Sequence, residues 1–205
     1  MLNRIICSVI GAIFIAIGIA TIITLNYGMP SFDTFVLTIS NFTGLTYTTA
    51  LRLVQLSIFI ILVVLKRYFS LTWTELFVSV ISVVVVTIFI DVVLQTFIGS
   101  LEKNIAWLII GFIFYVYGIT LLVQSDIFLA PNDKILTAIS HRSKHTYAFY
   151  KVLSDILMLV FSLIVVWQMG YDISISLVSI FLTFFTGIFV GLFSKLNNIV
   201  INKLK

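Results

Sequence analysis

Charged residues are scarce in this chain of 205 residues: Asp, Glu, Lys and Arg together make up only 10% of it. A soluble domain usually carries about a quarter charged residues. The hydrophobic fraction is 61% and the mean hydropathy is +1.22, so a folded chain of this size could not cover itself with polar surface. Lipid must therefore replace water around it, and the composition predicts an integral membrane protein.

Cysteine and proline are also few. The single cysteine, Cys7, cannot form an intramolecular disulfide and does not indicate a redox compartment. The chain has two prolines and no run of like charges or of Ser and Gly, so no linker sets a soluble domain apart. The net charge of +4 is expected from basic cytoplasmic loops. No basic stripe with interleaved aromatic residues is present, so nucleic acid is not an expected partner.

Motifs that carry catalysis are missing as well. The chain has no P-loop, nucleophile elbow, HExxH motif or cofactor fingerprint, so neither an enzyme nor a cofactor is expected. His141 and His145 are four residues apart and could share a helix face as metal ligands. Arg142 and Lys144 stand between them, and cationic neighbours oppose metal binding. A solvated cytoplasmic turn is therefore favoured over a metal site.

Six apolar stretches reach the length of about 20 residues that a membrane-crossing helix needs. They cover residues 5–25, 47–65, 76–98, 105–125, 146–167 and 173–193, and the third can also be taken to start at Trp73. Two shorter segments, 31–43 and 131–143, cannot span as helices. Each is expected to be either interfacial or re-entrant and tucked into protein. The predicted fold class is an all-α integral membrane protein with six transmembrane helices.

The chain resembles itself at a distance of 100 residues. Without a gap, this shift superimposes residues that chance matches seldom explain: Gly11/Gly111, Gly18/Gly118, Asp33/Asp133, Ser40/Ser140, Thr46/Thr146, Tyr47/Tyr147 and Ser79/Ser179. We therefore predict an internal duplication, with one three-helix repeat in residues 1–100 and a second in residues 101–205. An odd number of spans forces the second repeat to enter from the opposite face, which predicts an inverted repeat with a site where the halves meet.

The distribution of Lys and Arg predicts the orientation of the chain. An intracellular N-terminus would leave Lys103 on the opposite side, with Arg52 near the membrane edge, and this asymmetry places both termini in the cytoplasm. The Asp33 segment would then face outside and the Asp133 segment the cytoplasm. The cytoplasmic side would hold Arg4, Lys66, Arg67, Lys134, Arg142, Lys144, Lys195, Lys203 and Lys205.

Charged residues inside the predicted spans need an explanation, because inserting each one into the membrane costs about 2.5–3.5 kcal/mol of free energy. Arg52 and Asp91 have similar depth in the second and third spans, so an ion pair is expected, with Asp33 as a candidate third member. Such a pair either locks helices together or lines a binding site.

The fifth span carries a second pair, Lys151 and Asp155, which are four residues apart and share a helix face. Asp155 sits nearer the middle of the membrane, and its equivalent in the first half is Gln55. An acid at that depth could bind a cation or exchange a proton, and Lys151 could neutralise it.

Two acidic residues begin the short segments. Asp33 and Asp133 could be N-caps, which accept hydrogen bonds from free backbone N–H groups, or they could line a pocket between the halves together with Asn132. Small residues also recur in the first span, at Ala12, Ala16 and Ala20, with Gly11 and Gly18 elsewhere on the same helix. Such a stripe allows close helix packing within one chain or between chains.

The run from Gly18-Ile19 through Gly28-Met29-Pro30-Ser31-Phe32-Asp33, with Thr43-Gly44-Leu45-Thr46 after it, resembles the first half of YczE/YitT-type bacterial membrane proteins. The second half repeats the turn as Ala130-Pro131-Asn132-Asp133. The chain departs from the pattern because Pro30 stands one residue early and Ser143-Lys144-His145-Thr146 replaces the later step. The resemblance implies a bacterial cytoplasmic membrane protein and carries over no catalytic residue.

Two functions remain open from the sequence. The first is a small transporter or permease whose unknown solute or ion binds between the halves, with Arg52, Asp91 and Asp155 as polar lining. The second is a non-transporting binding or accessory subunit that docks a membrane partner, or a second copy of itself, through a face such as the alanine stripe. Six-helix substrate-capture subunits of similar length offer only an analogy for the second.

Overall fold

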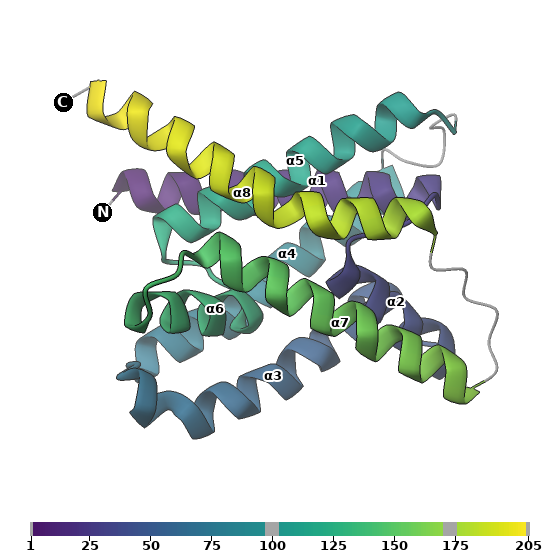
Figure 1. Cartoon of the computed structure of the whole chain (residues 1–205), viewed down its shortest axis with the longest axis horizontal. Helices are drawn as coiled ribbons and strands as arrows, with labels where there is room; N and C mark the ends of the chain where they lie inside the picture. Colours follow the sequence, from purple (N-terminus) through teal and green to yellow (C-terminus); the bar gives the residue numbers. More distant parts are fainter. Residues whose placement is uncertain (1, 97–102, 170–175, 204–205) are drawn as a thin grey trace.

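The computed structural model describes residues 2–96, 103–169 and 176–203, and every regular element in them is a helix (Figure 1). The expected all-α fold class is confirmed. The expected division of the chain at residue 100 lies outside the described residues. The helices are α1 (Leu2–Leu25), α2 (Ser31–Thr43), α3 (Tyr47–Phe69), α4 (Trp73–Thr96), α5 (Ile105–Ser125), α6 (Pro131–Arg142), α7 (Tyr147–Met169) and α8 (Leu177–Lys203).

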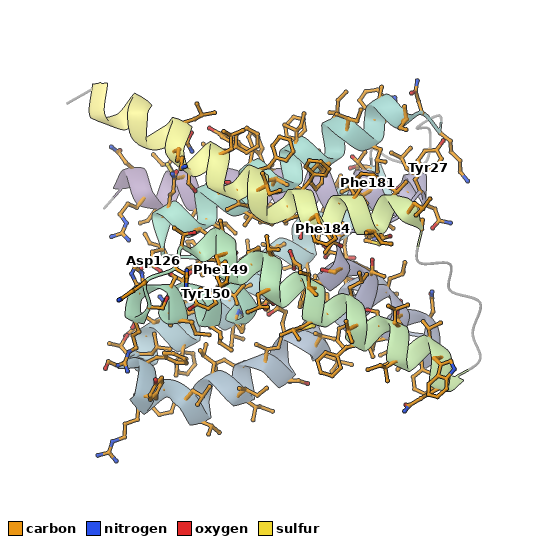
Figure 2. All side chains as sticks on the ribbon, in the orientation of Figure 1. Tyr27, Asp126, Phe149, Tyr150, Phe181 and Phe184 are labelled. Atoms are coloured by element: carbon orange, nitrogen blue, oxygen red, sulfur yellow. The ribbon has the colours of Figure 1, made fainter. Side chains whose placement is uncertain are left out.

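Six of these helices, α1, α3, α4, α5, α7 and α8, are long and apolar enough to cross a membrane. The third span begins at Trp73, the earlier of the two expected starts. Figure 2 labels large apolar side chains on the outer helices, and Phe149, Phe181 and Phe184 among them are exposed. An apolar exterior of this kind suits lipid rather than water. The chain is therefore an integral membrane protein with several spans.

The two remaining helices, α2 and α6, contain 13 and 12 residues. At a rise of about 1.5 Å per residue they are shorter than the roughly 30 Å hydrocarbon core. Helix α2 packs against α3, α7 and α8, and α6 packs against α3, α4 and α7. Both begin near the middle of the bundle and run toward opposite ends (Figure 1). Of the two expected arrangements, the one tucked among the spans fits these contacts.

The helices of the second half recur about 100 residues after those of the first. Helices α2 and α6 start 100 positions apart, and α3 and α7 both start and end 100 positions apart. The residues that follow α1 and α5, Asn26 and Asp126, share a positive φ of 51°. Packing recurs too, because α1 contacts α4 as α5 contacts α8, and α2 contacts α7 as α6 contacts α3.

Helices α1 and α5 cross at glycines in the centre of the bundle. A Cβ atom at Gly18 would lie 2.6 Å from the carbonyl oxygen of Gly111, and one at Gly118 would lie 2.7 Å from that of Gly11. The order of these contacts shows that the two helices run antiparallel. Between the glycines, the rings of Phe14 and Phe114 meet edge to face at 5.0 Å. Only glycine allows backbones to approach this closely.

The alanine stripe on α1 is buried inside the chain. Ala12, Ala16 and Ala20 are all closed to the surroundings, because α1 packs against both α4 and α5. The stripe therefore serves packing within one chain. The expectation that it could dock a partner protein is wrong.

The starts of the two short helices have the same shape, although their sequences differ. Pro30 precedes α2 with φ −54° and ψ 152°, and Ala130 precedes α6 with φ −60° and ψ 153°. The ends differ, because Gly44 follows α2 in the left-handed conformation while Ser143 follows α6 in an extended one. The turn before each short helix therefore has the same shape in both halves, although the proline is shifted. The turn after the short helix differs between the halves, because the Thr-Gly-Leu-Thr step is replaced in the second half.

Candidate functional site

A cavity of about 70 Å³ lies where the beginnings of α2 and α6 meet. Its walls come from both halves of the chain, including α1, α3, α5 and α7. Phe32, Val83 and Phe128 are among its apolar lining residues. Five of the eight expected site residues line it: Asp33, Gln55, Asn132, Asp133 and Lys151. Tyr115 also lines it and was not expected, whereas Asp155, which was expected as polar lining, does not line it and instead contacts Lys151.

The two aspartates of the short helices are held by tyrosines at equivalent positions. The Tyr47 hydroxyl donates to Oδ1 of Asp33 at 2.6 Å, and the Tyr147 hydroxyl donates to Oδ1 of Asp133 at 2.8 Å. Each tyrosine is the first residue of the span that follows. The same hydrogen bond therefore ties each short helix to its neighbour in both halves.

Neither aspartate is an N-cap, so that expectation is wrong. Pro30 and Ala130 occupy the cap positions, and neither side chain caps its helix by a hydrogen bond. Helices α2 and α6 start two residues earlier than the aspartates, which leaves Asp33 and Asp133 inside the first turn. A carboxylate there still interacts favourably with the positive end of the helix dipole.

Of the alternatives expected for Asp33 and Asp133, a pocket between the halves fits the structure, whereas the membrane sides that their segments face stay a prediction. Both line the same cavity. Residues 26–30 and 126–130 turn the chain back into the bundle after α1 and α5, so the first turns of both short helices meet in its middle (Figure 1). Only the far ends of α2 and α6 point in opposite directions.

Lys151 connects the second aspartate to a third carboxyl. Its Nζ lies 3.3 Å from Oδ1 of Asp155 and 4.0 Å from Oδ1 of Asp133. The expected pair within α7 is confirmed, and the side chains of Lys151 and Asp155 are only 3% and 1% exposed. The contact with Asp133 adds a partner that spacing along α7 does not predict.

Gln55 and Asp155 occupy equivalent positions but have different partners. Oε1 of Gln55 accepts from the backbone N–H of Asn132 at 3.2 Å, which satisfies a free donor at the start of α6. The carboxylate of Asp155 accepts no hydrogen bond from the described part of the chain, and Lys151 is its ionic partner. The first half thus uses this position to cap the start of α6, whereas the second half places a buried carboxylate at the equivalent position.

The expected ion pair of Arg52 and Asp91 is present at 3.4 Å. Nε of Arg52 also donates to Oγ1 of Thr87 at 2.8 Å. The two charged side chains are 41% and 39% exposed, and neither lines the central cavity. Asp33 is not a third member, because it bonds to Tyr47 instead. The pair joins α3 to α4 beside a separate recess of about 170 Å³.

The two histidines lie away from the cavity. The ring of His145 stacks on Phe149 with the centroids 4.5 Å apart. Within residues 2–96, 103–169 and 176–203, no group of three or more His, Cys, Asp or Glu side chains is arranged to hold a metal ion.

Sequence reasoning missed three features of this region. Tyr115 lines the cavity from α5, and a tyrosine within an apolar span gives no signal by itself. The roles of Tyr47 and Tyr147 could have been found, because both match in the 100-residue repeat. Lys134 is buried and pairs with Glu75 at 3.0 Å and Asp126 at 3.1 Å, whereas its charge suggested a cytoplasmic loop.

Comparisons with known proteins give a family and no activity. Residues 2–195 match a family described as "Family of unknown function (DUF6198)". No curated protein and no solved structure matches the chain. The resemblance to YczE/YitT-type proteins stays a prediction. Since the match covers nearly the whole chain, the chain belongs to the DUF6198 family.

Proposed function

We propose that this member of the DUF6198 family is a small transporter or permease, and not an enzyme. Its solute binds in the central cavity, between two inverted three-helix halves. The observation that carries the proposal is a buried cluster of ionisable side chains around an open space, at the point where two short helices begin. Ionisable groups inside a membrane protein usually mark such a pathway.

The inverted arrangement is supported by the contacts between α1 and α5. Gly11 meets Gly118, and Gly18 meets Gly111. A helix that meets its own repeat equivalent in antiparallel order implies a two-fold axis across the helix pair. Phe14 and Phe114, which are also repeat equivalents, touch near that axis. Inverted halves of this kind place transport sites at their interface.

The two short helices support binding in the middle of the membrane. Both α2 and α6 begin at the cavity, and the first turn of a helix offers free N–H groups and a partial positive charge. Transporters with interrupted helices use such ends, together with nearby oxygens, to hold solutes and coupling ions.

A purely structural role fits the central cluster less well than it fits Arg52 and Asp91. That outer pair joins two neighbouring helices, and Thr87 completes its hydrogen bonding. The central cluster keeps an open cavity, and Asp33 retains one oxygen without a partner in the described residues. Buried polar groups that only lock a fold are usually satisfied.

We further propose that the chain lies in a bacterial cytoplasmic membrane with both termini in the cytoplasm. The start of α1 and the end of α8 lie at the same end of the bundle (Figure 1). Contacts of basic residues gather there as well: Arg4 donates to the carbonyl oxygen of Ser125, and Arg142 donates to Ser70. Lys205, which was also expected on the cytoplasmic side, lies outside the described residues.

Transport is tested with the purified full chain in proteoliposomes. Solutes are applied from a panel of inorganic cations, amino acids and sugars, and flux is recorded as charge movement or as uptake of labelled solute. Asp155→Asn should abolish the flux of any solute that the wild-type protein moves, while circular dichroism and gel filtration show an intact fold. Asp91→Asn is the matched control, because it removes a carboxylate that pairs with Arg52 and neither lines the cavity nor pairs with Lys151. Unchanged flux in Asp155→Asn would contradict a site at this cluster.

For the alternative of an accessory subunit, the expected docking face was the alanine stripe, and that stripe is buried inside the chain. A membrane partner or a homodimer would have to use another apolar face. Co-purification of a stoichiometric membrane subunit, together with the absence of flux by the chain alone, would favour that alternative.

A further inference from the structure

We propose that the central cavity binds one small monovalent cation, held between Asp33 of the first half and Asp133 of the second. The inference deepens the proposed function and rests on it for the meaning of the site in transport. Binding itself can be measured separately from transport.

Asp33 offers an unused oxygen to the cavity. Its side chain is buried and lines the cavity wall. Oδ1 accepts from Tyr47, whereas Oδ2 has no hydrogen-bond partner among the described residues. Leaving a buried carboxylate oxygen without a partner is unfavourable. A cation in the cavity would complete its coordination.

Asp133 faces the same space from the opposite half. Oδ1 of this residue accepts from Tyr147 at 2.8 Å and lies 4.0 Å from Nζ of Lys151. The tyrosines therefore orient both carboxylates through the same kind of hydrogen bond. Rigid orientation before binding reduces the entropy lost when a ligand binds.

The charge of the cluster favours a monovalent ion. Asp33, Asp133 and Asp155 bring three carboxyls, and Lys151 is the ammonium that the structure pairs with two of them. The starts of α2 and α6 add roughly half a positive charge each. With all groups ionised, about one negative charge remains without compensation, and burying it alone would be costly.

The size of the cavity favours a small ion. The cavity volume is about 70 Å³, well below the roughly 300 Å³ at which pockets for drug-sized ligands start and above the about 10–15 Å³ that a cavity needs to hold one water molecule. A cation with a few waters fits this volume. Neutral oxygens of Tyr115 and Asn132 border the same space, and hard cations prefer such oxygen ligands.

Protonation of the carboxyls is the competing way to remove the excess charge. A proton would satisfy Asp33 without any metal ion or ammonium ion in the cavity. The two explanations differ in what stabilises the protein. A bound cation raises the unfolding temperature with the logarithm of its own concentration, once that concentration exceeds the dissociation constant, whereas protonation responds to pH alone.

The test uses the purified full chain in detergent at about pH 8, where ordinary carboxyls are ionised. Choline chloride, whose quaternary ammonium is bulkier than the three test cations and has no N–H donor, keeps the ionic strength constant while NaCl, KCl or NH4Cl replaces it. Unfolding is followed by tryptophan fluorescence. At least one of the three small cations should raise the unfolding temperature as a saturable site requires, with the logarithm of its concentration above the dissociation constant. If none of them does, the cation site is overturned and protonation explains the cluster.

Variants locate the site. Asp33→Asn should remove the saturable response, while Asp91→Asn, which changes a carboxylate outside the cavity, should keep it. If Asp33→Asn does not fold, Asp133→Asn takes its place, and the wild-type titration remains decisive when neither folds. A response that persists in a folded Asp33→Asn protein would place the ion elsewhere and overturn the assignment.

Flux measurements separate this inference from the proposed function. Cation binding without transport of any solute would leave the site standing and remove the transporter. Transport of a solute without any saturable cation effect would leave the transporter standing and remove the cation site.

Discussion

The two halves of this protein share a backbone but not a set of charges. Helix bounds, the residues with positive φ after α1 and α5, and the tyrosine–aspartate hydrogen bonds all recur at an interval of 100 residues. Lys151 and Asp155, in contrast, stand where the first half has Leu51 and Gln55. The backbone therefore tolerates either an apolar and amide pair or an ionic pair at the same two positions.

This difference concentrates the buried charge in one half of a nearly symmetric frame. Gln55 uses its oxygen to satisfy the start of α6, so the first half needs no ion at this place. Asp155 is spared that role and faces Lys151 instead. The second half thus adds Lys151 and Asp155 to the buried ionisable groups, whereas the first half contributes Asp33, and the following substitutions test that difference.

The largest effect is expected from Lys151→Leu, which copies Leu51 into the second half. The change leaves Asp133 and Asp155 buried without their ammonium partner. Removing one member of a buried ion pair costs about 3–5 kcal/mol, so the free energy of unfolding should fall by about that amount. Denaturant titration of the purified protein, followed by tryptophan fluorescence, measures the loss.

The double variant Lys151→Leu/Asp155→Gln sharpens this comparison. It gives the second half the same two residues as the first and removes the unpaired carboxylate. Most of the stability lost in Lys151→Leu should return, because replacing both partners of a buried pair is often nearly neutral. A double variant as unstable as the single one would show that the two positions are not interchangeable between halves.

A smaller and unequal pair of effects is expected from Tyr47→Phe and Tyr147→Phe. Each removes one hydrogen bond to a carboxylate, typically worth about 1.5–3 kcal/mol. Tyr47→Phe should cost more, because Asp33 then has no hydrogen-bond donor on either oxygen. Asp133 keeps Lys151 at 4.0 Å when Tyr147 is replaced. The same denaturant titrations compare the two, and equal losses would contradict the asymmetry.

The smallest effect is expected where the ends of the short helices differ. Gly44 has φ 69°, which costs a residue with a Cβ about 1–2 kcal/mol. No atom lies within 4 Å of a Cβ built there, so the free energy of unfolding of Gly44→Ala should fall only by this conformational cost. Lys144→Ala, at an exposed residue of the second turn, is the control and should stay within about 0.5 kcal/mol of wild type. Thermal unfolding of both variants provides the measurement.

Much of the fold could be predicted from the sequence because lipid imposes simple rules. A span of about 20 apolar residues is visible in any hydropathy profile, and the pair of Lys151 and Asp155 follows from helical spacing. The depth of Arg52 and Asp91 predicted their pairing correctly. The prediction that Arg52 and Asp91 belong to the central site was wrong, because neither residue lines the cavity.

The meeting of Asp33 and Asp133 could not be predicted, since it depends on how two short connections turn. Residues 26–30 and 126–130 bring the chain back into the bundle, and neither segment has a pattern that signals this. The preference of aspartate for N-caps misled the interpretation, because Pro30 and Ala130 had already set the helix starts. Lys134 was misplaced for a similar reason: the turn after α5 brings Asp126 back to it, and Glu75 comes from the start of α4.

The contact between α2 and α7 also constrains how the chain is made. A ribosome adds about 5–20 residues per second, so roughly 5–20 seconds pass between completion of α2 and appearance of α7. During that interval the nascent chain carries α2 without α7, one of the helices that it packs against. The packing of this first-half helix is therefore completed only after α7 of the second half has been made.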